Sequence, residues 1–332
     1  MLLSNIPSEG NEMKKSSAIA LAAIGIFAAS QAFAASQFIM ATGGTSGTYY
    51  PLGGAISQLI TDNSDGTVAC VAQATGASVE NLNLTNSGDV DLALVQNDVA
   101  DYAKNGTLFF KAPLTNIVGI CRLYPEHRQV VVTPESGITC IEEFKGHRIS
   151  VGAPGSGDAA NAQQILEAVG LHDGKEFVGF DAHHLSVAEG ISHFKDRLID
   201  GFMYTTGVPN AGIQEIVTSQ QPMRFIEIKG ELRDKIIAKH PFFSPAVIEK
   251  GSYSKLDHDV ETLAVQCCLV ARRDMTDEEA YAVTKAIFEN LEALGNAHFK
   301  GKSVTLEQAL DGMTLDIHPG ALKYYKEKGL VK

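Results

Sequence analysis

The stretch that decides the fold is residues 38–60, FIMATGGTSGTYYPLGGAISQLI, in which an apolar run, a glycine-rich turn and a helical pattern follow one another. Residues 38–40 predict a short strand, and apolar residues then recur at helical spacing from Leu52 to Ile60. The turn at 43–48 contains only Gly, Ser and Thr. Such a strand–loop–helix unit is the building block of α/β proteins.

The same unit recurs along the chain. Further strands are predicted at 67–73, 92–96, 148–152 and 201–204, and all except the strand at 92–96 are followed by a Gly-, Ser- or Thr-containing turn. Strands that alternate with helices of about 10–15 residues indicate parallel α/β sheets. Residues 117–133 and 243–271 are extended, and we expect the chain to cross between two lobes there. After Thr276 the pattern is mainly helical.

Length and composition limit the class of protein. A chain of 332 residues with 45% hydrophobic and 20% charged residues is long enough for two domains and is not of the disordered type. Its 27 basic and 39 acidic residues give a net charge of −12. Because this charge repels phosphate backbones and anionic lipids, and no local basic stripe offsets it, we expect no nucleic-acid partner and no peripheral membrane surface.

The N-terminus has the order of a secretory signal peptide. Lys14 and Lys15 precede an apolar run at 18–29, and small residues lead to a cleavage point after Ala34. Residues 1–34 are therefore expected to be removed and the protein to be periplasmic. Two glutamates before the basic pair are atypical of a signal peptide, so we expect translation to begin at Met13 and residues 1–12 to be an upstream extension.

Five cysteines make an odd number for an exported chain, and none forms a C-x-x-C motif. Disulfide pairing stays open from the sequence. Because most of these cysteines lie in apolar, strand-like runs, buried free thiols are the favoured interpretation. The five are Cys70, Cys121, Cys140, Cys267 and Cys268.

Four loops are candidates for a binding cleft: residues 43–48, 75–78, 155–157 and 205–207. In open α/β sheets, ligands bind beyond the carboxyl ends of the strands, where helix N-termini present unpaired N–H groups. Glycine allows close approach and hydroxyls bond without adding charge, so such loops suit a carboxylate or a phosphate. Strand–helix turns also use Gly and Ser for purely structural reasons, but four such loops from both halves favour a cleft.

The sequence matches none of the motifs for catalysis, cofactor binding or metal binding that we compared with it. The loop at 43–48 lacks the lysine of a P-loop, residues 152–157 have the dinucleotide-binding glycines in reversed spacing, and Ser156 is not in G-x-S-x-G. The sequence leaves open a catalytic Ser–His pair that comes together only in the folded chain. We expect no enzyme activity and no cofactor. The best metal cluster is expected to be surface histidines only, and it comprises Asp181, His183, His184 and His193.

Seven motifs in order resemble the TAXI-type solute-binding proteins of tripartite ATP-independent periplasmic (TRAP) transporters. They span the chain after the signal peptide. The motifs are TGGTSGTYYPLGG at 42–54, ATGASVEN at 74–81, DLALVQ at 91–96, LYPE at 123–126, VGAPGSG at 151–157, VPNA at 208–211 and HPGA at 318–321.

The resemblance implies a type II periplasmic-binding-protein fold with two α/β lobes joined by hinge strands. Lobe I would comprise residues 35–125 and 243–332, and lobe II residues 126–242. The lobes would close over a small carboxylate, such as glutamate or a related dicarboxylate like 2-oxoglutarate, and deliver it to the membrane subunits of a TRAP transporter. We expect the receptor to be a monomer.

Residue by residue, the resemblance assigns cleft positions in both halves of the chain. They are Thr45, Ser46, Tyr49, Thr75, Ser78, Gln96, Gly155, Ser156, Gly157, Thr206 and Gly207. Residues 158–160 and 204–206 depart from the family pattern, which leaves the ligand open, and Asp158 is interpreted as a helix cap. Arg122 and Arg148 are candidate carboxylate partners, with neither selected. An exported α/β enzyme acting on a small anionic substrate and a receptor for an inorganic oxyanion stay open as alternatives.

Overall fold

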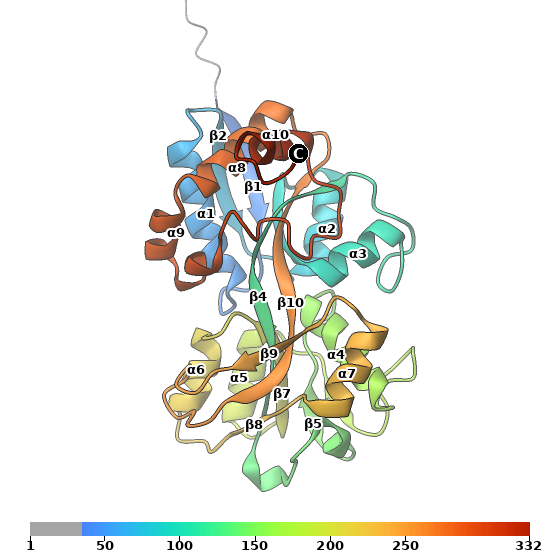
Figure 1. Ribbon diagram of the computed structural model, residues 1–332. Coiled ribbons are helices and arrows are strands. Elements are labelled where there is room, and N and C mark those ends of the chain that lie inside the picture. The colour runs from blue at the N-terminus through green and yellow to red at the C-terminus, as the bar shows by residue number, and fades with distance from the viewer. Residues whose placement is uncertain (1–34) are drawn as a thin grey trace, which may run out of the picture. The chain divides into compact units, whose positions relative to one another are not determined.

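A computed structural model describes residues 35–332 (Figure 1). The predicted signal peptide, cleavage point and start at Met13 lie outside the described residues. The strands are β1 Ser36–Ala41, β2 Val68–Gln73, β3 Leu92–Gln96, β4 Ile117–Val132, β5 Arg148–Ser150, β6 Asp181–His183, β7 Gly201–Thr206, β8 Arg224–Ile226, β9 Ser244–Ile248 and β10 Val260–Arg272. The α-helices are α1 Tyr49–Asn63, α2 Ser78–Ser87, α3 Asn97–Asn105, α4 Gly157–Ala168, α5 Val187–Lys195, α6 Ala211–Thr218, α7 Gly230–Lys239, α8 Asp277–Phe288, α9 Leu291–Ala297 and α10 Pro319–Glu327. The 3-10 helices are η1 Pro134–Ser136, η2 Ile141–Phe144 and η3 Phe299–Ser303.

The strands form one continuous hydrogen-bonded path in the order β2-β1-β3-β10-β4-β7-β5-β6. β1 pairs in parallel with β2 and β3, and β5 pairs in parallel with β6 and β7. β10 is antiparallel to both β3 and β4, and β4 is antiparallel to β7. The expectation of parallel sheets therefore holds at the outer strands only. The two connecting strands run antiparallel because one takes the chain out and the other brings it back.

Two α/β lobes share these connecting strands (Figure 1). Lobe I holds β1–β3 with α1–α3 and α8–α10, and lobe II holds β5–β9 with α4–α7. β4 and β10 extend through both lobes and pair with each other along their middle portions. This arrangement confirms the predicted fold class of two α/β lobes joined by hinge strands.

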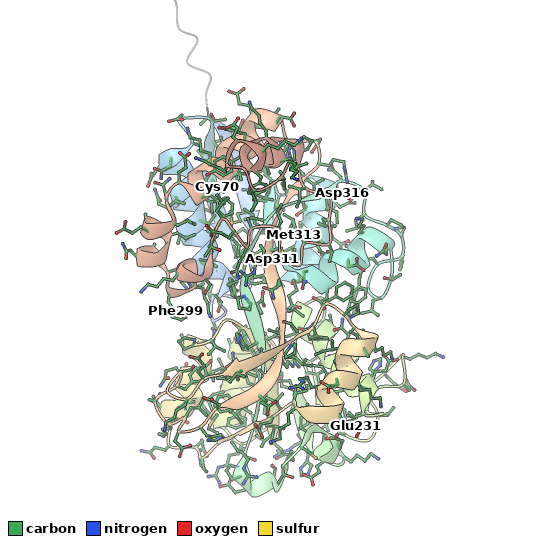
Figure 2. All side chains as sticks on the ribbon, viewed as in Figure 1. Cys70, Glu231, Phe299, Asp311, Met313 and Asp316 are labelled. Atoms are coloured by element: carbon green, nitrogen blue, oxygen red, sulfur yellow. The ribbon has the colours of Figure 1, made fainter. Side chains whose placement is uncertain are left out.

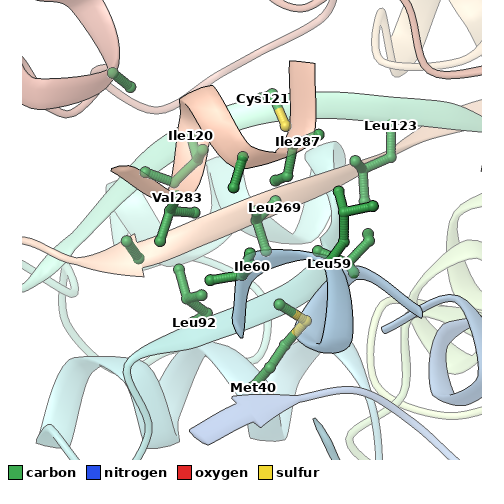
Figure 3. Close-up of a cluster of buried hydrophobic side chains, with 14 of the residues drawn as sticks. Met40, Leu59, Ile60, Leu92, Ile120, Cys121, Leu123, Leu269, Val283 and Ile287 are labelled. Atoms are coloured by element: carbon green, nitrogen blue, oxygen red, sulfur yellow. The ribbon is translucent and has the colours of Figure 1, made fainter. Parts of the chain in front are cut away.

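Each lobe has its own apolar core on either side of its part of the sheet. In lobe I, side chains from β1, β3 and β10 pack against α1 and α8, as Met40, Ile60, Leu92, Leu269 and Ile287 show in Figure 3. A second cluster lies on the α2 and α3 side, and two further clusters fill lobe II. Each fully buried Leu or Ile contributes roughly 1.5–3 kcal/mol, so these clusters hold each lobe together independently of the cleft.

β4 is one strand of 16 residues and occupies the stretch at 117–133 that the sequence predicted to be extended. Proline lacks the N–H that a strand hydrogen-bonded on both edges needs, so Pro125 requires a free edge at its position in β4. In the structure Pro125 pairs with Gln266 of β10, while β7 pairs with β4 only from His127 onward. The strand therefore has one free edge at Pro125, where a missing N–H is tolerated.

The second crossing between lobes lies within β10. The sequence placed the return to lobe I at residue 243, but Ile248 and Val260 still pack in a lobe II cluster, and Cys267 is the first β10 residue in the large lobe I core. The extended stretch at 243–271 contains two strands, and its pattern does not show which one crosses. The division at residues 125 and 126 stays a prediction.

All five cysteines are free, and four of them are buried, as the sequence favoured; Cys140 is partly exposed. Between residues 35 and 332, none of the helices is both long enough and apolar enough to span a bilayer.

Candidate functional site

A cavity of about 120 Å³ lies between the lobes, at the carboxyl ends of β1, β3 and β7 and the N-termini of α1, α2 and α4. Its size is of the order of the roughly 150 Å³ cavity that holds a benzene molecule, so it suits a small solute. Both lobes and the hinge strand β4 contribute to its walls. The lining residues are Gly43, Gly44, Gly47, Thr48, Tyr49, Thr75, Gly76, Ala77, Ser78, Gln96, Glu126, Ala153, Ser156, Gly157, Asp158, Leu185, Ser186, Val187, Tyr204, Thr205 and Thr206.

Most of the cleft positions chosen from the sequence come together in this cavity. Those that line it are Tyr49, Thr75, Ser78, Gln96, Ser156, Gly157 and Thr206. Four do not line it. Thr45 is exposed and Ser46 is half-buried in the first loop, Gly155 uses its carbonyl to accept a bond from Val79 N at 3.1 Å, and Gly207 packs against Lys300. A ligand role for any of these residues stays a prediction.

Several predicted hydroxyls already have partners inside the protein. Thr48 Oγ1 and Thr206 Oγ1 bond across the two lobes at 2.8 Å. Ser78 Oγ accepts from Gln96 N at 3.1 Å, and Thr75 Oγ1 donates to Asn81 Oδ1 of α2 at 2.6 Å. These hydroxyls therefore shape the loops, and backbone N–H groups at the helix N-termini are the main donors left for a ligand.

The N-terminus of α4 is capped by Ser156 and not, as the sequence suggested, by Asp158. Ser156 Oγ accepts from Ala159 N at 3.1 Å and donates to Ala153 O at 2.7 Å. This satisfies the third N–H of the helix and leaves those of Gly157 and Asp158 without an intrahelical partner. Two N–H groups of a 12-residue helix are thus available to an anionic group in the cavity.

Asp158 instead forms a buried ion pair with Arg128 of β4. Arg128 Nη1 lies 3.1 Å from Asp158 Oδ1 and 2.9 Å from Thr205 Oγ1. Burial raises the pKa of Asp158 to about 6 and lowers the pKa of Arg128 to about 10, so both groups are charged at neutral pH. The pair stiffens the cavity wall in lobe II and places a positive charge one layer behind the lining.

Neither arginine considered from the sequence reaches the cavity. Arg122 donates to Gln266 and Gln308 in a separate groove, which is also lined by Asp311 and Met313, both labelled in Figure 2. Arg148 pairs with Asp200 at 2.6 Å near the surface of lobe II. Sequence reasoning missed Arg128 because a charged residue in the middle of a buried strand carries no local motif.

Glu126 is the second carboxyl group of the cavity, and it too was missed as a site residue. Its side chain accepts from Tyr49 OH at 2.7 Å and from Gln96 Nε2 at 3.4 Å. It is only 2% exposed, and burial raises the pKa of Glu126 to about 8. The LYPE motif ends at this residue, so the signal was present in the sequence, but nothing there placed the side chain in the cleft.

Bonds between the lobes hold the cavity closed. Asp98 of α3 accepts from Asn161 Nδ2 at 2.8 Å and from Gln164 Nε2 at 3.2 Å, both on α4. Gln164 also donates to Tyr102 OH at 2.9 Å. Together with the Val79–Gly155 and Thr48–Thr206 bonds, these contacts describe a closed state of the two lobes.

The histidine cluster does not form a metal site. His183 lies 3.1 Å from Asp181 near the surface of lobe II. No group of three or more His, Cys, Asp or Glu side chains suited to hold a metal ion occurs among residues 35–332.

The profile of one protein family matches residues 40–329, which is most of the chain. The chain belongs to the NMT1-like family. The fold of this NMT1-like chain is also similar to solved structures. A binding protein component of an ABC phosphonate transporter from Pseudomonas aeruginosa superposes with a TM-score of 0.54 at 11% identity, over 80% of this chain and 78% of the other.

Two further structures have the same fold. A Xanthomonas citri protein bound to ATP gives a TM-score of 0.53 at 11% identity, over 89% of this chain and 97% of that one. A putative L-cystine ABC transporter protein from Listeria monocytogenes gives a TM-score of 0.50 at 13% identity, over 82% of this chain and 98% of that one. At such low identities these likenesses establish the two-lobe fold of periplasmic binding proteins for this NMT1-like chain.

Proposed function

We propose that this protein is a periplasmic solute receptor of the TAXI type. It captures a small carboxylate, glutamate or a related dicarboxylate such as 2-oxoglutarate, by closure of the two lobes, and it delivers the ligand unchanged to the membrane subunits of a TRAP transporter. The export step would be directed by residues 1–34. The seven ordered sequence motifs, membership of the NMT1-like family and the two-lobe fold support this assignment.

The single observation that carries the proposal is the cavity between the lobes, which is lined from both sides. Solute receptors work by hinge closure, in which a ligand that contacts both lobes favours the closed state by its differential affinity. Here Ser78 on lobe I and Gly157 on lobe II line one cavity of about 120 Å³. Three helix N-termini at its walls favour carboxylate groups.

The affinity expected for such a site is moderate. A charge-assisted hydrogen bond contributes about 1.5–3 kcal/mol, and three or four of them exceed the costs of ordering and closure by enough for micromolar binding, near −8 kcal/mol. A chain with a net charge of −12 does not attract an anion from a distance, so short-range N–H donors have to supply this energy.

Isothermal titration calorimetry with L-glutamate and 2-oxoglutarate tests the proposal, with sulfate and phosphate as comparison ligands. We expect at least one dicarboxylate to bind with a 1:1 stoichiometry and to be recovered unchanged. Binding of the inorganic oxyanions alone, or conversion of the ligand to a product, would contradict the proposal.

Two glycine variants link binding to closure. An added Cβ at Gly157 would lie 2.3 Å from Gln96 Oε1 of the opposite lobe, so Gly157→Ala should obstruct closure and weaken ligand binding by more than tenfold. Gly54→Ala is the matched control, because a Cβ there meets nothing within 4 Å. Equal binding by both variants would mean that the ligand does not require this closed state.

A further inference from the structure

The charges around the cavity are unusual for a site that would hold an anion. Of the residues that line it, none is Arg, Lys or His, whereas two are carboxyl groups, Glu126 and Asp158. A ligand with only negative charges would meet both of them without a lining cation. The two carboxyl groups are therefore the features that a ligand has to satisfy.

Asp158 is already neutralised by the protein. Its Oδ1 atom faces Arg128 Nη1 at 3.1 Å and accepts the backbone N–H of Thr205. This carboxylate has the cation and the donor that it needs, so it offers little to a ligand.

Glu126 has no cation in direct contact, although it interacts electrostatically with Lys300 at a longer distance. Its two partners, Tyr49 OH and Gln96 Nε2, are neutral donors, and no ion pair involving Glu126 occurs within 4.0 Å among the described residues. Gln96 Oε1 beside it is buried with no hydrogen-bond partner. A buried carboxylate with no cation in direct contact and a buried amide oxygen without a donor both favour a positively charged donor group in the cavity.

We propose that Glu126 determines ligand specificity by binding the ammonium group of an α-amino acid, while the helix N-termini hold its carboxylates. The inference rests on the proposed function and narrows it: L-glutamate is favoured over 2-oxoglutarate, which has the same two carboxylates but a carbonyl in place of the ammonium group. In a closed cavity of about 120 Å³, this one substituent decides whether Glu126 is neutralised.

The pH dependence of binding follows from the surroundings of Glu126. Burial raises the pKa of Glu126 to about 8 in the ligand-free protein, and an ammonium group requires the ionised form. Binding of L-glutamate must therefore release a proton below pH 8, and its affinity should rise by up to tenfold per pH unit between pH 6 and 8. The titratable or charged groups that act on Glu126 or are acted on by it are Tyr49, Tyr124, Tyr204, Asp98, Asp158, Cys267, Cys268 and Lys300.

In the alternative interpretation, ligand affinity changes with pH in the opposite direction. A protonated Glu126 would donate a hydrogen bond to the carbonyl or carboxylate of 2-oxoglutarate, so affinity would fall as the carboxyl group ionises above pH 8. The direction of the pH dependence separates the two roles without any assumption about the rest of the site.

The experiment is calorimetric titration of the full mature chain with L-glutamate and with 2-oxoglutarate at pH 6, 7, 8 and 9, in two buffers of different ionisation enthalpy. We expect tighter binding of L-glutamate by at least tenfold at pH 8, with proton release. Glu126→Gln should weaken L-glutamate by at least tenfold and change 2-oxoglutarate by no more than about threefold. Glu80→Gln is the matched control near the cavity mouth, where Glu80 accepts from Gly76 N at 2.8 Å, and should leave the preference unchanged.

The outcomes distinguish the two proposals. Equal or tighter binding of 2-oxoglutarate by the wild-type protein, or a preference that survives Glu126→Gln, overturns the role of Glu126 and leaves the receptor function standing. Failure of both ligands to bind the wild-type protein overturns the proposed function, and the inference falls with it. Thermal unfolding of Glu126→Gln without ligand shows whether that variant is folded, and Glu126→Asp offers a second test because the shortened carboxylate should restore part of the preference.

Discussion

Glu126 and Asp158 are buried carboxyl groups that line the same cavity, yet their surroundings differ. Asp158, at the start of α4, pairs with Arg128 at 3.1 Å, whereas Glu126, on the hinge strand β4, accepts only from Tyr49 and Gln96. Burial raises the pKa of Asp158 to about 6 and that of Glu126 to about 8, and part of the difference comes from the Arg128 charge, which lowers the pKa of Asp158. One carboxylate is part of the scaffold, and the other is left for a ligand.

The two carboxyl groups also differ in whether their contacts depend on closure of the lobes. The Asp158 pair lies within lobe II and should persist when the lobes separate, while Tyr49 and Gln96 reach Glu126 from lobe I. This difference leads to four predictions, beginning with the largest expected effect.

Asp158→Asn removes the counter-charge of Arg128 and should destabilise the protein by about 3–5 kcal/mol, because breaking a buried pair leaves an uncompensated charge. Arg128 Nε and Nη2 are already buried without partners, so nothing nearby can compensate. Urea denaturation measures the loss. Asp316→Asn, which breaks an exposed pair with Lys104, is the control and should change stability by less than about 1 kcal/mol. A similar small effect at Asp158 would show that the pair is not part of the scaffold.

Asn161→Ala removes one of the two amide donors that α4 offers to Asp98 across the lobes. Because a hydrogen bond to a charged group is worth about 1.5–3 kcal/mol and this one forms only in the closed state, affinity for L-glutamate should fall by roughly 10- to 100-fold. Calorimetry gives the change. Asn83→Ala, which loses a bond within lobe I only, is the matched control. Unchanged affinity in Asn161→Ala would mean that the hydrogen bond between Asn161 and Asp98 does not contribute to closure.

The contribution of Glu126 to the stability of the ligand-free protein should fall as the pH rises from 6.5 to 8. The pKa of Glu126 is raised by burial from 4.5 to about 8, so in this range the native state holds a proton that the unfolded state has lost. The slope from this one group is at most about 1.4 kcal/mol per pH unit. Glu126→Gln should remove this contribution, so the unfolding free energy of the wild type relative to that of the variant should fall over this range in denaturation curves at successive pH values.

Other groups limit that window. Burial raises the pKa values of Asp98 and Asp158 to about 6, so both act mainly below pH 6.5, and it lowers the pKa of Lys300 to about 8, so this group adds stability as pH rises above 8. Burial also lowers the pKa of five histidines, which adds stability as pH rises through their unfolded value of about 6.5 and opposes the Glu126 contribution equally in wild type and variant. They are His127, His172, His240, His298 and His318. A slope that is the same in wild type and Glu126→Gln between pH 6.5 and 8 would contradict the assignment.

Ser156→Ala should have the smallest effect, a loss of about 1 kcal/mol, because the side chain caps α4 through Ala159 N. The loss should appear in unfolding of the ligand-free protein and not only in ligand binding, which is the difference between a cap and a ligand contact. Ser156→Asp, which keeps a cap acceptor, should recover most of the stability in the same denaturation measurement. A loss confined to ligand affinity would return Ser156 to the role of a direct ligand.

The sequence by itself determined the local units of this protein. Residues 38–60 specify strand, turn and helix because apolar spacing and glycine act over a few residues, and β3 coincides with the predicted strand at 92–96. The four Gly-, Ser- and Thr-rich loops were located in the same way. The two-lobe class followed from repetition of this unit and from the extended stretches between its copies.

Only the tertiary structure decided which side chains meet. The antiparallel hinge, the continuation of β4 through Pro125 and the late crossing within β10 depend on which strand edges are free, and residue spacing does not record that. Arg128 and Asp158 lie 30 residues apart, and Glu126 approaches Gln96 only when β4 and the end of β3 are brought to the same cavity. The charges that set the chemistry of the cavity arise from such distant contacts, because burial and electrostatic pairing are properties of the folded chain.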